Sequence, residues 1–286
     1  MLPERTAAVA MTRVTRDGSA EETDVLAVEE PLEIRLAWQA GGERREKNIA
    51  VTMRTPGHDA DLATGFLFTE GLIRDRREIE SVRHWGSPNV VRVALSPGAE
   101  PDVSKLDRHF YTTSSCGVCG KTSIDALRIA HDALLSAEPF SGEVIHTLPA
   151  RLRDEQTTFR ATGGIHGAAL FDREGTLLRA REDIGRHNAV DKVIGSCFRE
   201  DLMPRSDTML LVSSRASFEL VQKAVVAGIP LLAVIGAPSS LSVERARQFN
   251  LTLLGFVRDG RFNVYTGAVT AERSAARPLT IDSSHG

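Results

Sequence analysis

Two cysteines three positions apart are the residues of this chain best suited to chemistry. Cys116 and Cys119 lie in a stretch with two glycines, two serines and two threonines, and Lys121 follows closely. An apolar pattern typical of a helix begins soon afterwards. A thiol near a helix amino terminus and a lysine loses its proton more easily, and the thiolate is the nucleophile. The pattern predicts a reactive cysteine on a pliant loop, an arrangement suited to passing sulfur from a donor to an acceptor.

Zinc binding is the main alternative for this cysteine pair. Tetrahedral zinc needs four ligands, commonly two such pairs or one pair with histidines. The chain has no second C-x-x-C, and no histidine upstream of the pair has glutamate two positions later, as zinc deaminases require. We therefore expect no metal. A zinc site remains the alternative, because His166 and His187 could approach the cysteine pair in space.

Two further interpretations of the cysteine stretch are weaker. A thioredoxin-like redox pair lies near the start of a short domain and follows an aromatic residue, whereas serines precede Cys116. Residues 115–122 resemble a phosphate-binding loop with serine in place of its first glycine. No strand ending in a magnesium-binding aspartate accompanies it, so we do not expect nucleotide hydrolysis. The glycines and small polar residues argue against a purely structural loop.

Polar residues also follow two apolar runs of strand length. Ser213 ends the run 209–213, Arg215 follows it, and Gly236 comes directly after the run 229–235. In open α/β sheets, ligands bind at the carboxyl ends of strands. We expect Ser213, Arg215 and the Gly236 loop to line one pocket suited to phosphate or a nucleotide.

A third strand ends in two arginines and a turn glycine. Planar guanidinium groups pair well with pyrophosphate and with guanine edges. The stretch comprises Phe256, Val257, Arg258, Asp259, Gly260 and Arg261.

Two more segments are rich in polar groups. The glycine-rich turn before His166 would let a ligand or another backbone approach closely, although a lone histidine is more often structural. Gly185, followed by Arg186, His187 and Asn188, would present polar groups at a helix amino terminus, where anions bind. A solvated helix face explains the same composition equally well.

The apolar pattern divides the chain into two parts. Alternation over 32–38, 49–53 and 90–95 predicts strands, with a turn at 41–42 and a helix capped by Asp59 or Asp61. Later in the chain, short apolar strands alternate with helices, which predicts a partly parallel sheet covered by helices. Its expected elements are a hairpin over 167–178, helices over 186–198, 218–227 and 243–249, and strands over 209–213, 230–235 and 251–257.

We therefore predict an α/β (α+β) protein with a small β-rich amino-terminal subdomain over 25–110. The main domain would cover 111–270, with the cysteine loop at its start. Residues 1–24 and 271–286 are polar and aperiodic, and we expect them to be flexible tails.

Composition narrows the class of protein. The 286 residues are 42% hydrophobic and 26% charged, which is typical of globular proteins. The net charge of -3 excludes a globally basic nucleic-acid binder. No apolar run reaches the roughly 20 residues that span a bilayer, and the first residues do not resemble a secretory signal. Cytoplasmic location is the default expectation, and Cys197 is expected in the core.

Several of these segments together resemble one family. The chain is similar, from about residue 25 to 270, to the FdhD/NarQ family, the accessory sulfurtransferases of formate dehydrogenase. The segments that carry the resemblance are 55–71, 114–120, 162–166, 182–192, 213–215 and 256–265.

The resemblance implies more than the residues alone do. It implies a cytidine-deaminase-like, three-layer carboxyl-terminal domain without the deaminase zinc ligands, and a homodimer. It implies a cysteine desulfurase as sulfur donor and the molybdenum bis(molybdopterin guanine dinucleotide) cofactor as acceptor, which is sulfurated before insertion into formate dehydrogenase. By position, Cys116 would hold the persulfide with Cys119 beside it, and residues 256–261 would bind the cofactor, with GDP as a mimic. A cofactor-binding chaperone without chemistry remains the alternative.

Overall fold

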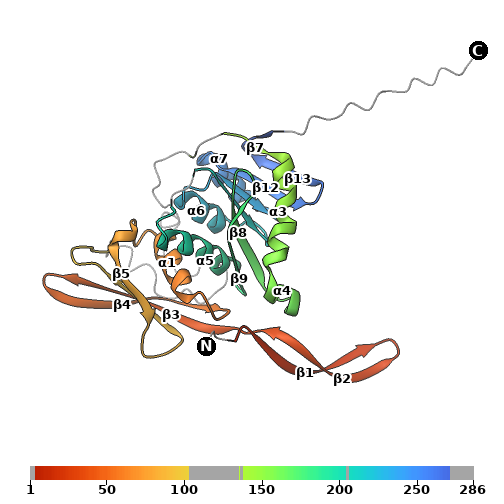
Figure 1. The fold of residues 1–286 in the computed structure, drawn as a ribbon, viewed down its shortest axis with the longest axis horizontal. Helices are drawn as coiled ribbons and strands as arrows, with labels where there is room; N and C mark the ends of the chain where they lie inside the picture. The colour runs from red at the N-terminus through yellow and green to blue at the C-terminus, as the bar shows by residue number, and fades with distance from the viewer. Residues whose placement is uncertain (1–3, 103–134, 136–137, 204–205, 271–286) are drawn as a thin grey trace, which may run out of the picture.

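The larger sheet has six strands in the order β13-β12-β11-β10-β8-β9. The computed structural model describes residues 4–102, 135, 138–203 and 206–270 (Figure 1). Strands β10, β11 and β12 run parallel, and their neighbours β8 and β13 are antiparallel to them. The strands are β8 (His166–Asp172), β9 (Leu177–Asp183), β10 (Thr208–Val212), β11 (Leu231–Val234), β12 (Thr252–Arg258) and β13 (Arg261–Thr266).

Helices cover both faces of this sheet. Leu148 and Leu152 of α3 (Gly142–Glu155) pack on one face. On the other face lie α5 (Arg186–Arg199), α6 (Phe218–Val226) and α7 (Ser240–Gln248). The central strands are buried on both faces, which explains their uninterrupted apolar sequences. The predicted mixed α/β class with three layers is confirmed.

Short elements complete this half of the chain. Ser141 caps α3 by accepting a hydrogen bond from the Val144 amide at 3.5 Å. Pro149 lies inside the same helix. The remaining elements are β7 (Phe140–Ser141), α4 (Thr157–Thr162) and β14 (Val269–Thr270).

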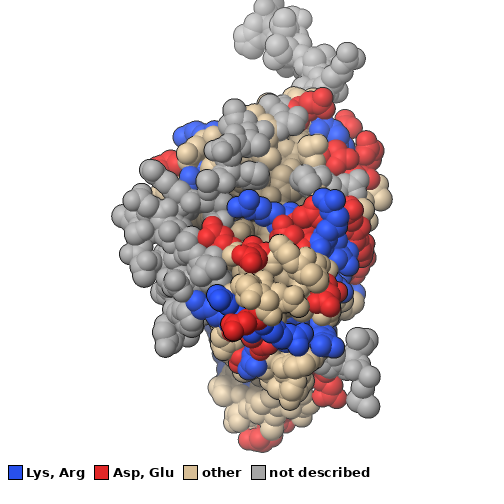
Figure 2. All heavy atoms as spheres, turned by 90° about the vertical axis from the view of Figure 1, so that its left-hand side faces the viewer, with Lys and Arg blue, Asp and Glu red and all other residues tan. Residues whose placement is uncertain are grey.

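A smaller sheet has the order β4-β3-β6-β5 and packs on one helix, α1 (Asp59–Thr69). Its strands are β3 (Glu30–Ala40), β4 (Glu43–Arg54), β5 (Ile79–His84) and β6 (Val90–Leu95), with a short 3-10 helix at Arg76–Glu78 before β5. The predicted turn at 41–42 joins β3 to β4. On the face of the molecule that Figure 2 shows, acidic and basic side chains are interspersed.

Helices α1 and α5 cross with their backbones in contact. A Cβ on Gly65 would lie 1.9 Å from the Asp191 carbonyl oxygen, and a Cβ on Gly195 would lie 1.9 Å from that of Asp61. Only glycine fits at either position. This crossing joins α1 to the larger sheet, and a single apolar core extends from Leu32 to Leu253 across both predicted subdomains.

The amino-terminal segment differs from the expected flexible tail. Strands β1 (Thr6–Thr15) and β2 (Gly18–Ala27) form an antiparallel hairpin, which we call the arm. Sequence reasoning missed it because nearly all of its side chains are exposed on both faces, so no apolar alternation marks it. The cap predicted for α1 was also wrong: His58 occupies the cap position, and Asp59 and Asp61 lie in the first turn.

Within the described ranges, none of the helices combines the length and the apolar character that crossing a membrane demands.

Candidate functional site

The loops after β10, β11 and β12 lie side by side. The Gly236 amide donates to the Ser214 carbonyl at 2.9 Å, and the Phe256 amide donates to the Gly236 carbonyl at 2.9 Å. A Cβ on Gly236 would lie 3.0 Å from the Arg215 side chain, so glycine allows the loops to come this close. The structure thus brings the predicted Ser213, Arg215 and Gly236 positions together with the third loop. Ligand binding there stays a prediction.

Phe256 has an unusual backbone. Its φ is 54°, in the left-handed region that bulky residues avoid. The β12–β13 pairing is irregular between Gly255 and Arg258, and the Phe256 side chain is 40% exposed. Strained, exposed residues gather at ligand sites because the surrounding fold holds them in place. The next residue, Val257, is wholly buried in the core beneath α3, so only its backbone could reach a ligand.

The two arginines of this stretch differ. One guanidinium nitrogen of Arg258 donates to the Ile235 carbonyl at 2.6 Å and to the Val257 carbonyl at 2.9 Å. Arg261 is exposed. Asp259 and Gly260 form the turn between them, with Gly260 at a φ of 76°. One arginine is therefore held against the loop after β11, and the other is available to a ligand.

A histidine, a serine and a glutamate meet beside these loops. The His187 Nε2 atom lies 3.2 Å from the Ser217 Oγ atom and 3.2 Å from the Glu219 Oε2 atom. The Ser217 hydroxyl also donates to Glu219 at 3.2 Å. These contacts hold the amino-terminal turns of α5 and α6 together. Sequence reasoning did not pair Glu219 with His187, because 32 residues separate them in the chain.

His166 opens β8 at the same end of the sheet. The neighbouring Gly167 amide donates to the Ser213 hydroxyl at 3.0 Å. The pKa of His166 is lowered, mainly because its ring is partly buried and further because of the Arg186 charge. The imidazole is therefore neutral near pH 7, so one ring nitrogen can donate a hydrogen bond and the other can accept one. Ser213 is occupied in fixing the start of β8.

Several polar groups at the start of α5 bond within the chain, and anion binding there stays a prediction. The Asp183 carboxylate is fully buried and accepts from the Gly185 amide at 2.8 Å and from Asn188 at 3.1 Å. The Lys192 ammonium lies 2.6 Å from the same carboxylate and donates to the Thr55 carbonyl at 2.8 Å. Burial lowers the pKa of Lys192. These buried polar groups do not form a solvated face, because they join α5 to the chain before α1.

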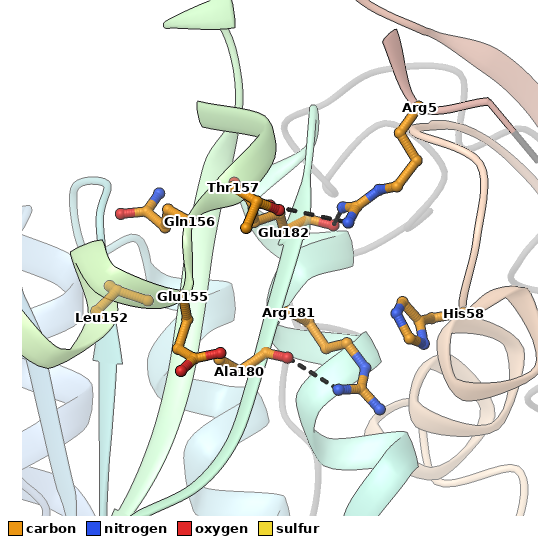
Figure 3. A pocket seen from close by; sticks show the side chains of 9 residues that line it. All are labelled: Arg5, His58, Leu152, Glu155, Gln156, Thr157, Ala180, Arg181 and Glu182. Atoms are coloured by element: carbon orange, nitrogen blue, oxygen red, sulfur yellow. Dashed lines mark hydrogen bonds and ion pairs between the residues drawn. The ribbon is translucent and has the colours of Figure 1, made fainter. Parts of the chain in front are cut away.

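A small cavity lies at the edge strand β9. It has a volume of about 60 Å³, and Figure 3 shows Arg5, His58 and Arg181 on one side of it. Arg5 donates to the Glu182 carbonyl at 3.2 Å, and Arg181 pairs with Asp61 at 2.9 Å. The lining residues are Arg5, His58, Leu152, Glu155, Gln156, Thr157, Ala180, Arg181 and Glu182. The chain itself neutralises most of these charges, and we assign no ligand to the cavity.

The predicted reactive cysteines, Cys116 and Cys119, lie outside the described residues. Cys197 is buried in the core as expected, and burial raises the pKa of its thiol. Within the described ranges, no group of three or more histidine, cysteine, aspartate or glutamate side chains is arranged to hold a metal ion.

Comparison with known proteins places the chain in a family. The profile of the FdhD/NarQ family matches residues 27–272. The chain belongs to that family. It is 46% identical over 268 residues to the sulfur carrier protein FdhD of Mycolicibacterium paratuberculosis, covering 90% of this chain and 96% of the relative. It is 47% identical over 266 residues to the sulfur carrier protein FdhD of Streptomyces coelicolor, covering 88% of this chain and 91% of the relative.

A solved structure shares the fold. It is described as a candidate formate dehydrogenase accessory protein from Desulfotalea psychrophila, and the two chains superpose with a TM-score of 0.73. The match covers 92% of this chain and 98% of the other at 23% identity, which supports the fold class alone. The family match begins at the last residue of β2, so the arm precedes it.

Proposed function

We propose that this chain is a sulfur carrier that serves formate dehydrogenase and sulfurates its molybdenum cofactor. The name shared by relatives that are nearly half identical over almost the whole chain supports the sulfur-carrier role. The structural observation that carries the cofactor part is the convergence of Arg215, Gly236 and the strained, exposed Phe256 at adjacent strand ends. Arginines and an exposed aromatic ring suit a charged dinucleotide.

The proposed chemistry begins at Cys116. Its thiolate attacks the outer sulfur of a persulfide on a cysteine desulfurase, the donor S–S bond breaks, and the desulfurase leaves as a thiolate. Cys116 then holds the persulfide, with Cys119 as its neighbour in the transfer. The outer sulfur passes to molybdenum(IV), which supplies the two electrons that convert it to a sulfido ligand. Cys116 leaves as a thiolate and takes a proton from water.

The three loops would hold the guanine dinucleotide arm of the molybdenum bis(molybdopterin guanine dinucleotide) substrate. Arg215 and Arg261 present guanidinium groups to its phosphates, and the Phe256 ring can stack on a base. Arg258 can add only the nitrogens that do not bond to the Ile235 and Val257 carbonyls. Gly260 lies in the turn between Arg258 and Arg261, and its lack of a side chain leaves room for close approach. The protein would act in the cytoplasm as a homodimer and deliver the sulfurated cofactor to formate dehydrogenase.

Intact mass tests the sulfur-carrier step. After incubation with a cysteine desulfurase and cysteine, we expect the chain to gain one sulfur atom at Cys116, which a reductant removes. Cys116→Ser should abolish the gain, and Cys197→Ser is the matched control because that thiol is buried. An unmodified Cys116 while the desulfurase turns over would contradict the proposal. So would about one zinc per chain that is lost in Cys116→Ser.

GDP binding, measured together with activation of formate dehydrogenase, distinguishes a sulfurtransferase from a chaperone that only binds the cofactor. A charge-assisted hydrogen bond contributes roughly 1.5–3 kcal/mol, so Arg261→Met should weaken calorimetric GDP binding about tenfold to a hundredfold. Cys116→Ala should bind GDP normally but fail to activate formate dehydrogenase in cells that lack the native protein. If Cys116→Ala activates the enzyme, the protein is a cofactor chaperone and the sulfur-transfer proposal is wrong.

A further inference from the structure

The Arg258 side chain ties the turn after β12 to the loop after β11. One guanidinium nitrogen donates to the Ile235 carbonyl at 2.6 Å and to the Val257 carbonyl at 2.9 Å. Ile235 directly precedes Gly236, whose carbonyl accepts the Phe256 amide at 2.9 Å. Hydrogen bonds from a charged donor are stronger than those between neutral groups. The Phe256 backbone and the Arg258 side chain are therefore bonded to the same short stretch of the chain.

The loop after β11 is confined on both sides. Its Gly236 amide donates to the Ser214 carbonyl in the loop after β10 at 2.9 Å. On the other side, a Cβ on Gly255 of β12 would lie 2.8 Å from Pro238, so the strand packs closely on this loop. Contacts with two neighbouring strands leave the loop little freedom. It can therefore serve as a fixed base for the turn after β12.

Phe256 needs a fixed base of this kind. Its φ of 54° lies in the left-handed region, which is costly for a residue with a Cβ. Such a backbone persists only where the surrounding structure over-determines it. The pairing of β12 with β13 is irregular between Gly255 and Arg258, and the Phe256 side chain is 40% exposed. Neither a regular ladder nor burial of its own ring holds this residue, so the bonds to the loop after β11 are needed.

We propose that Arg258 is a positioning residue of the cofactor site. Its bonds to the two carbonyls keep the turn closed on the loop, and the closed turn holds Phe256 in the left-handed conformation with its ring exposed. Arg261, across the turn, supplies charge to the phosphates. Arg258 thus acts on the base through Phe256. The ligand in this inference rests on the proposed function, whereas the hold on Phe256 is a property of the free protein.

The geometry favours this role over a direct grip on a phosphate. A guanidinium group has five N–H donors in a planar fork and often binds a phosphate through two parallel bonds. Both N–H groups of one terminal Arg258 nitrogen already point to the Ile235 and Val257 carbonyls. An end-on pair of bonds from both terminal nitrogens would require Arg258 to release the loop.

Hydrogen exchange in the free protein tests the hold on Phe256. The Phe256 amide is bonded to the Gly236 carbonyl, so it should exchange slowly in the wild type. Arg258→Met should speed its exchange about tenfold or more, because a bond from a charged donor is lost. Amides of the central strand β10 should keep their protection, which shows that the change is local.

Two further variants serve as controls in this measurement. Arg258→Lys retains a charged donor for the Ile235 carbonyl and should restore most of the protection of the Phe256 amide. Arg261→Met should leave that protection unchanged. Unchanged exchange of the Phe256 amide in Arg258→Met would overturn the proposal.

Binding of GDP and of guanosine distinguishes the roles of the two arginines. Arg258→Met should weaken both ligands by a similar factor of about ten, as expected when stacking on one base is lost. Arg261→Met should weaken GDP and leave guanosine binding unchanged. In the Phe256→Ala background, Arg258→Met should have no further effect on guanosine, because the residue through which it acts is gone.

The opposite pattern would show that Arg258 binds the ligand itself. A loss confined to GDP in Arg258→Met would mean a direct phosphate contact, and additive losses of guanosine affinity in the double variant would equally refute the proposal. A wild type that binds neither ligand would instead contradict the proposed cofactor site. Hydrogen exchange would then still decide whether Arg258 holds Phe256.

Discussion

Segments 182–192 and 256–261 are both dense in polar residues, yet the fold uses them in opposite ways. In the first, Asp183 and Lys192 are fully buried and hydrogen-bonded within the chain. In the second, Phe256 and Arg261 face solvent, and Phe256 has a strained backbone. Buried polar groups are satisfied by the protein, and exposed, strained ones are available to a ligand. A high density of polar residues alone therefore does not identify a binding site. What matters is whether the hydrogen-bond partners of these residues lie within the chain or are left to a ligand.

The largest expected effect is on the buried segment. Lys192→Met would leave the Asp183 carboxylate buried without its counter-ion, and breaking such a pair costs about 3–5 kcal/mol of unfolding free energy. Chemical denaturation measures the loss. Arg261→Met is the matched control, since it removes an exposed charge and should change stability by less than about 0.5 kcal/mol. Equal effects of the two variants would mean that the contrast between the segments is wrong.

An intermediate effect is expected at the strained residue. Phe256→Gly relieves a left-handed backbone that costs roughly 1–2 kcal/mol, partly offset by the greater freedom of glycine in the unfolded chain. We expect a small gain in stability together with weaker GDP binding. Asp201→Gly is the control because Asp201 has a φ of 58° at the end of α5. It should gain stability without any change in GDP affinity, and reduced affinity there would contradict the assignment.

The smallest effect concerns pH. Burial, and then the Arg181 charge, lower the pKa of His58 from 6.5 to about 4. Between these values the unfolded chain binds a proton that the folded chain does not, so stability falls as the pH decreases from about 6.5 to about 4. The His58 side chain is 45% exposed, so screening should limit this loss to less than about 1 kcal/mol.

His58→Asn tests this contribution, because asparagine does not titrate and tolerates the left-handed backbone at this position. Denaturation at pH 6.5 and pH 4.5 should show a smaller acid loss in the variant than in the wild type. Identical losses would show that His58 does not contribute.

The sequence predicted the larger sheet well because its strands are short apolar runs separated by amphipathic helices. The strand β8, the helix α5 and the parallel strands β10 to β12 lie close to their expected positions, whereas β9 extends to Asp183, beyond the hairpin predicted over 167–178. The sequence did not predict α3, because Pro149 lies inside it and proline normally ends a helix. It did not predict β5 either, because this short, partly exposed strand shows no clear alternation. The arm was missed because the side chains of β1 and β2 are exposed on both faces, so no apolar alternation marks these strands.

The candidate site was only partly predictable. Loops that follow neighbouring strands meet by topology, so Ser213, Arg215 and Gly236 could be grouped from sequence. The pairing of Asp183 with Thr55 joins residues 128 positions apart, and no local pattern encodes it. The left-handed backbone of Phe256 was equally invisible, since phenylalanine does not mark that conformation.

The glycine contact between α1 and α5 bears on how this chain could be dissected. Gly65 packs against the Asp191 backbone and Gly195 packs against the Asp61 backbone, so each helix forms the packing surface of the other. Every α5 residue from Asn188 to Phe198 is buried, so removal of α1 would expose a continuous apolar flank to water. A fragment that begins after residue 110 would retain a complete six-stranded sheet and yet be prone to aggregation. The two halves are therefore not interchangeable modules.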